Sequence, residues 1–288
     1  MSLTTIVQEW LRGVGPRGES AVTARRHIAA ETGADVGAIC ATVSGDVFFA
    51  VPSRTRSGHV LGPGTVLTRG DEVRAYYEAR AGSYLVRSSA QLTSIATDWY
   101  VFNETSATLL GTGMVDGVDA TGREWVVQSA VLFPASEDGI AGEICITRRP
   151  MGDVIRGTPA DDAGSAVAAG ALLDHVAAAV RSGDWDGIGA VLSPSHTLAV
   201  RVDPGAAHTA TGREASVSAI AALFAGTSDL SVLVRVATDW YVFAEYLAPL
   251  TGGGWRRLAV IHGIDDGLIS GSFGYGRSLG GGAIAGGG

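Results

Sequence analysis

A stretch of seven residues occurs twice in this chain, and it strongly limits how the chain can fold. Residues 96–102 read A-T-D-W-Y-V-F, and residues 237–243 repeat all seven letters. A separation this long exceeds the unit of a solenoid and has the size of a whole domain. We therefore expect two copies of one domain-sized unit.

The repeated stretch predicts a β-strand, because Trp, Tyr, Val and Phe favour half-buried, pleated positions. Side chains alternate between the two faces of a strand, so Asp98, Tyr100, Phe102 and Glu104 would share one face. In the second copy, Tyr241 takes the place of Tyr100. Such a face carries an acid, a phenol and a ring, as the wall of a ligand pocket would. The alternative is that the stretch forms only core.

The composition excludes several kinds of active site. All 21 basic residues are arginine, which excludes a Schiff-base lysine, a PLP-linked lysine and a Walker A loop within this sequence. Cys40 and Cys145 lack the Cys and His spacing of a zinc site. No G-x-G-x-x-G motif follows a strand. We therefore expect neither a metal nor a cofactor.

Charge and hydropathy bear on partners and location. A net charge of −8 leaves no basic footprint for nucleic acid. No apolar run reaches the roughly 18 residues that span a bilayer, and the first residues lack the pattern of a signal peptide. Two cysteines suit a reducing compartment. We expect a cytoplasmic protein that binds neither nucleic acid nor membrane.

Hydrophobic periodicity predicts that each copy runs from helices to strands. Helices grouped before strands indicate an α+β fold, with a mostly antiparallel sheet curled into a cone over the helices. The interior of such a cone suits a small ligand. The expected units are a first domain at 1–150, a linker at 151–163, a second domain at 164–278 and a Gly-rich flexible tail at 279–288.

Several motifs resemble the nuclear transport factor 2-like superfamily, also called SnoaL-like or ketosteroid isomerase-like, with a cystatin-like α+β cone. R-S-G-D-W-D-G-I-G-A-V-L at 181–192 is similar to the helix-turn pattern of that family. I-D-D-G-L-I-S-G at 264–271 and S-E-D-G-I-A-G at 136–142 resemble its last hairpin. H-I-A-A-E-T-G-A-D-V-G-A-I at 27–39 is similar to its first helix. The resemblance implies two tandem cones.

The resemblance places the isomerase's functional residues only in part. Its phenolic Tyr falls on His27, and its general-base Asp falls on Val51 in the first copy and on Asp203 in the second. Neither copy holds the whole set, which disfavours a plain ketosteroid isomerase. Asp203 precedes Pro204 and Gly205, so ordinary turn chemistry is an equal alternative.

The remaining candidates come from the residues themselves. Arg54 and His59 lie on a Gly- and Pro-rich stretch at 52–70, which we expect to be a long loop of functional type. Tyr76 could line the first cone together with Tyr100 and Glu104, and Tyr241 and His262 could line the second. For each of these residues, a structural role in the core is the competing interpretation.

These observations favour a cofactor-independent lyase or isomerase. It would bind a small hydrophobic substrate, aromatic or alicyclic and oxygenated, and use side-chain acid–base catalysis. The expected catalytic residues are His27, His59 and Asp203, with the first copy favoured as the working site. A non-catalytic binding or assembly module and an epoxide hydrolase are the alternatives. We also expect the copies to pack as an intramolecular pseudo-dimer, with further homo-oligomerisation left open.

Overall fold

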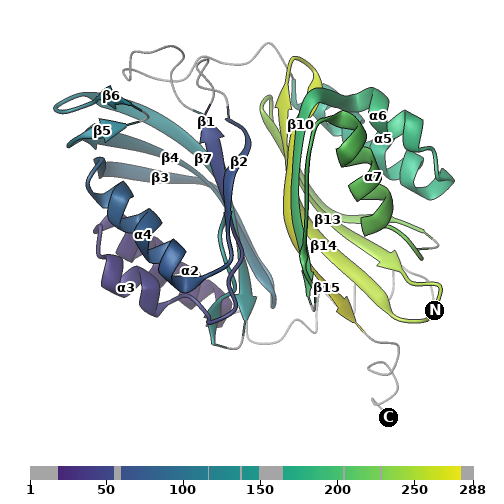
Figure 1. The fold of residues 1–288 in the computed structure, drawn as a ribbon, viewed down its shortest axis with the longest axis horizontal. Helices are drawn as coiled ribbons and strands as arrows, with labels where there is room; N and C mark the ends of the chain where they lie inside the picture. The colour runs from purple at the N-terminus through teal and green to yellow at the C-terminus, as the bar shows by residue number, and fades with distance from the viewer. Residues whose placement is uncertain are drawn as a thin grey trace.

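The computed structural model describes residues 19–54, 60–115, 117–136, 138–148, 165–203, 205–227 and 229–279. Within these residues the fold is α+β and consists of two units with the same order of elements. Figure 1 shows two curved sheets that face each other, with the helices of each unit on its outer side. The expected linker and most of the Gly-rich tail lie outside the described residues.

In its described residues, the first unit contains three helices and a curved sheet. The helices are α2 (Glu19–Thr32), α3 (Val36–Ala41) and α4 (Gly70–Ala81), and the main strands are β1 (Phe49–Arg54), β2 (Val60–Leu67), β3 (Tyr84–Ala96), β4 (Tyr100–Gly111), β7 (Glu124–Ser136) and β9 (Ile144–Arg148). The short strands are β5 (Met114–Val115), β6 (Val118–Asp119) and β8 (Gly139–Ile140).

The second unit repeats this plan. Its helices are α5 (Ala166–Ser182), α6 (Trp185–Val191) and α7 (Arg213–Leu223), and its strands are β10 (Leu192–Asp203), β11 (Ala207–Thr211), β12 (Ser231–Ala237), β13 (Tyr241–Pro249), β14 (Trp255–Asp265) and β15 (Leu268–Leu279). Strand β15 continues to Leu279, one residue into the expected tail.

The two sheets have the same topology. Their strand orders are β2-β1-β9-β7-β4-β3 and β11-β10-β15-β14-β13-β12. In each sheet one pair is parallel, β1 with β9 and β10 with β15, and the other neighbouring strands of these orders are antiparallel. The expected α+β fold with two equivalent cones is therefore confirmed.

The sequence predicts a long loop at 52–70, but much of this stretch belongs to two strands. Strands β1 and β2 form an antiparallel hairpin in which Phe49 pairs with Leu67 and Val51 pairs with Thr65. Leu67 is buried in a core cluster with Phe49 and Tyr77. The burial of Leu67 thus helps to hold this edge strand in place.

The repeated stretch forms a turn followed by a strand. Thr97 accepts hydrogen bonds from the backbone nitrogens of Trp99 and Tyr100, at 3.3 and 3.1 Å, and Thr238 makes the same bonds in the second copy. Strand β4 therefore begins at Tyr100 rather than at the start of the repeat. The identical turn explains why threonine is kept in both copies of the motif.

The convex faces of the two sheets pack against each other. One buried cluster contains residues of both units, among them Phe102, Leu132, Phe243, Ile261 and Phe273. Ion pairs also cross this contact, since Arg148 Nη1 lies 2.8 Å from Asp239 Oδ2 and Arg257 Nη1 lies 3.9 Å from Asp98 Oδ1.

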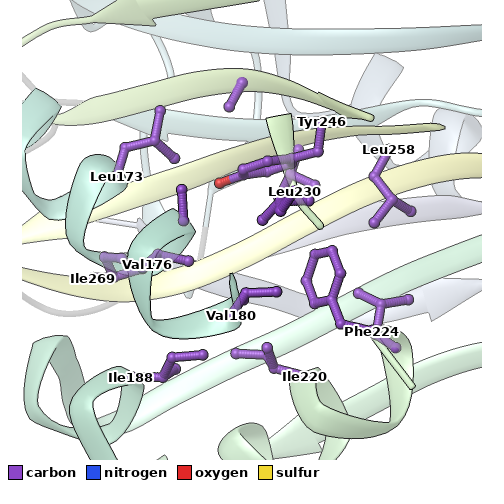
Figure 2. Close-up of a cluster of buried hydrophobic side chains, with 14 of the residues drawn as sticks. Leu173, Val176, Val180, Ile188, Ile220, Phe224, Leu230, Tyr246, Leu258 and Ile269 are labelled. Carbon is purple, nitrogen blue, oxygen red and sulfur yellow. The ribbon is translucent and has the colours of Figure 1, made fainter. Parts of the chain in front are cut away.

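The interior of the second cone is filled by its own side chains. Figure 2 shows residues of α5, α6 and α7 packed on the concave face of the sheet, with Tyr246 and Leu258 among them. Leu173, Ile188 and Leu258 are each 1% exposed or less. The concave face of the second sheet is therefore covered by core residues, in the place where the sequence also allowed a ligand site.

Candidate active site in the first cone

The first cone holds a cavity of about 140 Å³ that is partly open to solvent. Its walls come from α2 and α4 and from the concave faces of β3, β4, β7 and β9. Ile28, Val127 and Val131 make part of this wall apolar. The titratable residues that line the cavity are Glu31, Tyr76, Arg80, Tyr84, Glu143 and Cys145.

Glu143 is brought to the cavity by the strand that follows the β7–β8 hairpin. Its backbone oxygen accepts a hydrogen bond of 2.9 Å from Ala50, which ties the start of β9 to β1. Gly142 permits this approach, because a Cβ at that position would lie 1.9 Å from the backbone oxygen of Phe48. Side chains alternate along β9, so Glu143, Cys145 and Thr147 all line the cavity.

A chain of three side chains extends from Glu143 into the core. The hydroxyl of Tyr77 donates a short hydrogen bond to Glu143 Oε2. His27 Nε2 lies 3.2 Å from that hydroxyl and 3.8 Å from Glu143 Oε2. The His27 side chain is completely buried, packed edge-on against Phe133, with a ring-centroid distance of 5.6 Å. His27 therefore contacts Glu143 and Tyr77 from the core and does not line the cavity.

The hydrogen-bond network assigns the protonated nitrogen of His27. The hydroxyl of Thr42 donates to the backbone oxygen of Ile39 at 2.7 Å, so it can only accept from His27 Nδ1, which lies 2.7 Å away. Nδ1 therefore carries a hydrogen, and Nε2 faces Tyr77. When protonated, Nε2 donates to the Tyr77 oxygen, and it can take the Tyr77 proton only when Tyr77 gives up its hydrogen bond to Glu143.

Electrostatics keep Glu143 ionised. Burial alone would raise its pKa, but the hydrogen bond and charge of His27, the charge of Arg80 and the hydrogen bond of Tyr77 hold the pKa below its usual range. Burial raises the pKa of Tyr77 well above its ordinary value, and the charge of Glu143 adds to this effect. The site therefore pairs a carboxylate with protonated phenols.

Tyr76 supplies a hydroxyl that faces the cavity. Among the residues that the structure describes, no side chain or backbone group forms a hydrogen bond with it. Burial raises the pKa of Tyr76 well above its ordinary value, and the charges of Tyr84 and Glu143 act in the same direction. The hydroxyl therefore stays protonated and can donate to a bound molecule.

Arg80 brings a positive charge to the same wall. It forms a short ion pair with Glu31, and its Nε donates to the Tyr84 hydroxyl at 2.9 Å. Its guanidinium carbon lies 5.5 Å from the centre of the Tyr77 ring. The charge of Glu31 is therefore balanced by Arg80. Glu143 is the cavity carboxylate that remains available to a ligand.

Three of these residues could also hold a metal ion. His27, Glu31 and Glu143 each offer one ligand atom, and these atoms lie within 4.8 Å of one another. The Arg80 guanidinium already occupies Glu31, and its positive charge opposes a cation there. The His27 nitrogens also have partners in Thr42 and Tyr77. This donor set fits an acid–base site better than a metal site.

The positions equivalent to this site are different in the second cone. The sheet register aligns Glu143 with Ser272, and the sequence aligns His27 with Val176. Ser272 belongs to a buried chain, because its Oγ lies 3.0 Å from His196 Nε2 and 2.8 Å from His262 Nδ1. His262 Nε2 is 2.8 Å from the Tyr246 hydroxyl. His262 lies on the side of the sheet that faces the second cone, but it is buried among core residues.

Asp203 does not face the second cone. Its neighbours Val200 and Val202 belong to the core of that cone, so Asp203 points to the opposite face of β10. There its Oδ1 accepts a hydrogen bond of 2.9 Å from Arg201, and its other oxygen accepts a short one from Tyr275. The interpretation of Asp203 as a base inside the second cone is therefore wrong in its geometry.

Tyr100, Glu104 and Tyr241 are also misplaced by the sequence-based prediction. All three are buried between the two sheets rather than inside a cone. Tyr100 donates across the contact to Glu245 Oε2 at 2.9 Å. Burial raises the pKa of Tyr241, and the facing Glu104 adds to this rise, so the two units make reciprocal Tyr–Glu contacts. The alternation along the strand was predicted correctly, but the polar face was assigned to the wrong side.

Two further candidates cannot be placed against the cavity. His59 lies outside the described residues, and for Arg54 the structure describes the backbone at the end of β1. Sequence reasoning missed Glu143 and Arg80. The alternation of Glu143, Cys145 and Thr147 with apolar Ile144 and Ile146 was the available signal for an inward-facing acid.

Comparisons with known proteins give structural similarity alone. No protein-family model and no curated protein matches this chain. A proposed polyketide cyclase of Xanthomonas campestris pv. campestris is 16% identical, covers 45% of this chain and 90% of its own, and has a TM-score of 0.37. A proposed ketosteroid isomerase of Kribbella flavida is 17% identical, covers 38% and 78%, and has a TM-score of 0.33.

A third similar structure is a proposed polyketide cyclase of Pseudomonas putida, which is 17% identical, covers 43% of this chain and 86% of its own, and has a TM-score of 0.35. Among the helices that the structure describes, none combines the length and apolar character that crossing a bilayer requires. In element order and sheet topology, the chain resembles the nuclear transport factor 2-like superfamily twice, once in each half.

Proposed function

We propose that the first unit is a cofactor-independent isomerase or lyase that moves a proton on a small oxygenated ring compound. The observation that carries this proposal is the ionised Glu143 at the wall of the cavity, with Tyr77 and His27 behind it. A carboxylate next to a protonated hydroxyl is the pair that enolisation requires.

The reaction begins with the substrate carbonyl oxygen accepting a hydrogen bond from Tyr76. Glu143 takes a proton from the adjacent carbon, and the electron pair of that C–H bond moves onto the carbonyl oxygen. The resulting enolate is stabilised by the Tyr76 hydroxyl and by the nearby charge of Arg80. In an isomerase, protonated Glu143 returns the proton to a different carbon. In a lyase, the enolate re-forms its carbonyl and expels a leaving group, hydroxide for example, which takes a proton from Glu143.

His27 and Tyr77 hold the base and its proton in this scheme. The Tyr77 hydroxyl orients Glu143 Oε2, and His27 Nε2 can accept a proton through Tyr77. His27 is therefore proposed as a positioning residue that also sets the charge of the site. This assignment keeps His27 in the first cone's machinery but moves the contact with substrate to Glu143 and Tyr76.

For the second unit we propose a supporting, non-catalytic role. Its cone is filled by core residues, and Ser272 stands where the first cone has Glu143. Its sheet gives the first sheet a buried face to pack on, as a partner subunit would. The intramolecular pseudo-dimer is accordingly proposed as the working unit, in the cytoplasm and without a nucleic-acid or membrane partner.

Epoxide hydrolysis is a second candidate, because Glu31, Arg80 and Glu143 share the cavity wall. Two carboxylates beside a guanidinium could activate water with one and protonate the epoxide oxygen with the other. Arg80 already binds Glu31 in a short ion pair, which favours the first candidate. Cyclohexene oxide in ¹⁸O-labelled water separates the two, because only the hydrolase yields a labelled diol.

The test is deuterium exchange at carbon, which does not require the natural substrate. Cyclohexanone and 3-methoxycyclohex-2-enone are incubated with the protein in D₂O, and loss of the α-proton signals is followed by NMR. The wild-type protein is expected to accelerate exchange of at least one ketone, with saturation. A rate equal to that of a heat-denatured sample for both ketones contradicts the proposal.

A further inference from the structure

We infer that the cavity of the first cone recognises a single six-membered ring that carries two oxygens in a 1,3 relationship. This inference rests on the proposed function for the identity of the site, and it adds the class of compound. It is carried by a row of hydroxyl side chains that neither the proton-transfer chemistry nor the core makes use of.

Thr105, Ser129 and Thr147 form this row across three neighbouring strands. Thr105 of β4 pairs with Ser129 of β7, and Ser129 pairs with Thr147 of β9. All three side chains line the cavity. In-register residues of adjacent antiparallel strands have Cβ atoms about 4.5–5.5 Å apart, so their hydroxyls stand side by side.

The hydroxyl row has no structural purpose that the described residues reveal. Within the described part of the chain, no hydrogen bond is made by the Thr105, Ser129 or Thr147 hydroxyl. The three side chains are partly exposed and line the cavity, so their hydroxyls are free to bond a molecule that enters it. The row therefore favours a bound molecule that carries oxygen.

The second unit shows what the same row becomes in a cone without a cavity. By sheet register, Tyr246, Leu258 and Gly276 occupy the positions of Thr105, Ser129 and Thr147. Figure 2 shows Tyr246 and Leu258 packed within the core. The fold thus needs no hydroxyl at these positions, which links the row to the cavity.

The volume of the cavity suits a ligand with one ring. Its volume is about 140 Å³, and a cavity of roughly 150 Å³ in another protein holds one benzene. The spacing of the row selects among the possible substituents. Neighbouring strands lie about 4.8 Å apart, which is also the separation of two oxygens in 1,3 positions on a six-membered ring. Two such oxygens can bond to two adjacent hydroxyls in parallel.

The row also fits the placement of the reacting groups. Thr147 lies four residues after Glu143 on the same face of β9, with Cys145 between them. A ring bound at the row would lie over Val131 and Cys145, because Val131 pairs with Cys145 next to the row. The edge of the ring away from its two bound oxygens then points toward Glu143.

The inference is tested by the affinities of phenol, catechol, resorcinol and hydroquinone for the full chain, measured by calorimetry. The three diols have the same atoms and differ only in oxygen spacing. Resorcinol is expected to bind at least tenfold more tightly than phenol and several-fold more tightly than catechol or hydroquinone. Equal affinities for the three diols, or no saturable binding by any of them, would overturn the inference.

The variants Ser129→Ala and Thr147→Val test the row itself. Each is expected to weaken resorcinol binding about tenfold while leaving phenol binding within a factor of two. Ser106→Ala is the matched control, since Ser106 lies next to Thr105 on the opposite face of β4. An unchanged resorcinol affinity in both row variants overturns the inference.

Binding and exchange also separate this inference from the proposed function. If resorcinol binds through the row but no ketone exchanges its α-protons, the site is a binding site and the enzymatic proposal fails. If exchange is catalysed while the row variants leave both resorcinol affinity and exchange unchanged, the enzymatic proposal stands and the ligand class is wrong.

Discussion

Phe102 and Phe243 stack face to face where the two sheets meet, with ring centroids 4.1 Å apart and an interplanar angle of 12°. They occupy the same position in the two copies of the repeated stretch. Each ring thus stacks on its own counterpart, as residues on the axis of an isologous contact between subunits do. The two copies of the repeated stretch contact each other in this cluster.

We expect Phe243→Ala to lower the free energy of unfolding by about 3–5 kcal/mol, because it opens a cavity between the sheets. Chemical denaturation measures this change. Leu92→Ala is the control, since Leu92 is 52% exposed on β3 and its truncation should change stability by about 0.5 kcal/mol or less. A loss at Phe243 no larger than at Leu92 would show that the contact contributes little to stability.

Glu245 is the buried charge of the same contact. It is 1% exposed, its Oε1 accepts from Arg257 Nε at 2.9 Å, and its Oε2 accepts from Tyr100 at 2.9 Å. Glu245→Ala leaves the buried Arg257 without this carboxylate and is expected to cost about 3–5 kcal/mol of unfolding free energy.

The exposed pair of Arg69 and Asp71 provides the comparison. These side chains are 66% and 65% exposed, so Asp71→Ala should cost about 1 kcal/mol or less. The double variant Glu245→Ala with Arg257→Leu should recover part of the loss, because it also removes the buried charge that Glu245 faces. A cost at Glu245 similar to that at Asp71 would contradict the role given to the buried pair.

The buried histidines of the second cone predict acid sensitivity. Burial lowers the pKa of His196 to about 3, with the charge of His262 as a second cause, and burial lowers the pKa of His262 to about 4. Both values lie below the unfolded value of about 6.5, so the unfolded state binds protons first as the pH falls. The stability that these groups provide is present above about pH 6.5 and is lost toward pH 4.

Unfolding free energies at pH 7.5 and pH 4.5 measure this effect. The wild-type protein is expected to lose about 3 kcal/mol or more over this range. The double variant His196→Gln with His262→Gln should show a clearly flatter dependence, whereas the exposed-residue control His175→Gln should follow the wild type. Parallel curves for all three proteins would rule out the buried histidines as the cause.

The fold was largely predictable from the sequence, and the site was predictable only in part. The repeat and the hairpin motifs determine local geometry, so two α+β cones follow from them. Whether a given face of the sheet contacts water, the core of its own cone or the other unit depends on contacts between units. The alternation of side chains along a strand cannot specify this. Tyr100 and Glu104 were for that reason assigned to the cone, although they face the second sheet.

The placement of His27 illustrates the same limit. Its position on α2 indicated an inward direction correctly, but its contacts are with Thr42 and Tyr77 rather than with the cavity. These partners lie in other elements of the chain, and the pairing depends on how α2, α4 and β9 meet. Glu143 escaped notice because a single acid at the start of a strand resembles an ordinary surface residue.

Turnover is expected to persist in the presence of chelators. The proposed steps use Glu143 and Tyr76, and Arg80 opposes a cation beside Glu31. The deuterium exchange rate should therefore be the same with and without EDTA, and after addition of Zn²⁺ or Mn²⁺ to the dialysed protein. Loss of exchange with EDTA and its recovery on adding one of these ions would instead assign His27, Glu31 and Glu143 to a metal site.

The location of the chemistry is the central claim, and it is tested most directly by comparing Glu143→Gln with Asp203→Asn. Both substitutions remove one carboxylate with little change of shape, one inside the first cone and one between the units. The rate of deuterium exchange is measured for each variant, and thermal melts confirm that both are folded. We expect Glu143→Gln to slow exchange by about 10²–10⁴-fold, as loss of a general base does, and Asp203→Asn to stay within a factor of about three. Near-normal exchange in Glu143→Gln together with loss in Asp203→Asn, with both proteins folded, would contradict the account and place the reaction outside the first cone.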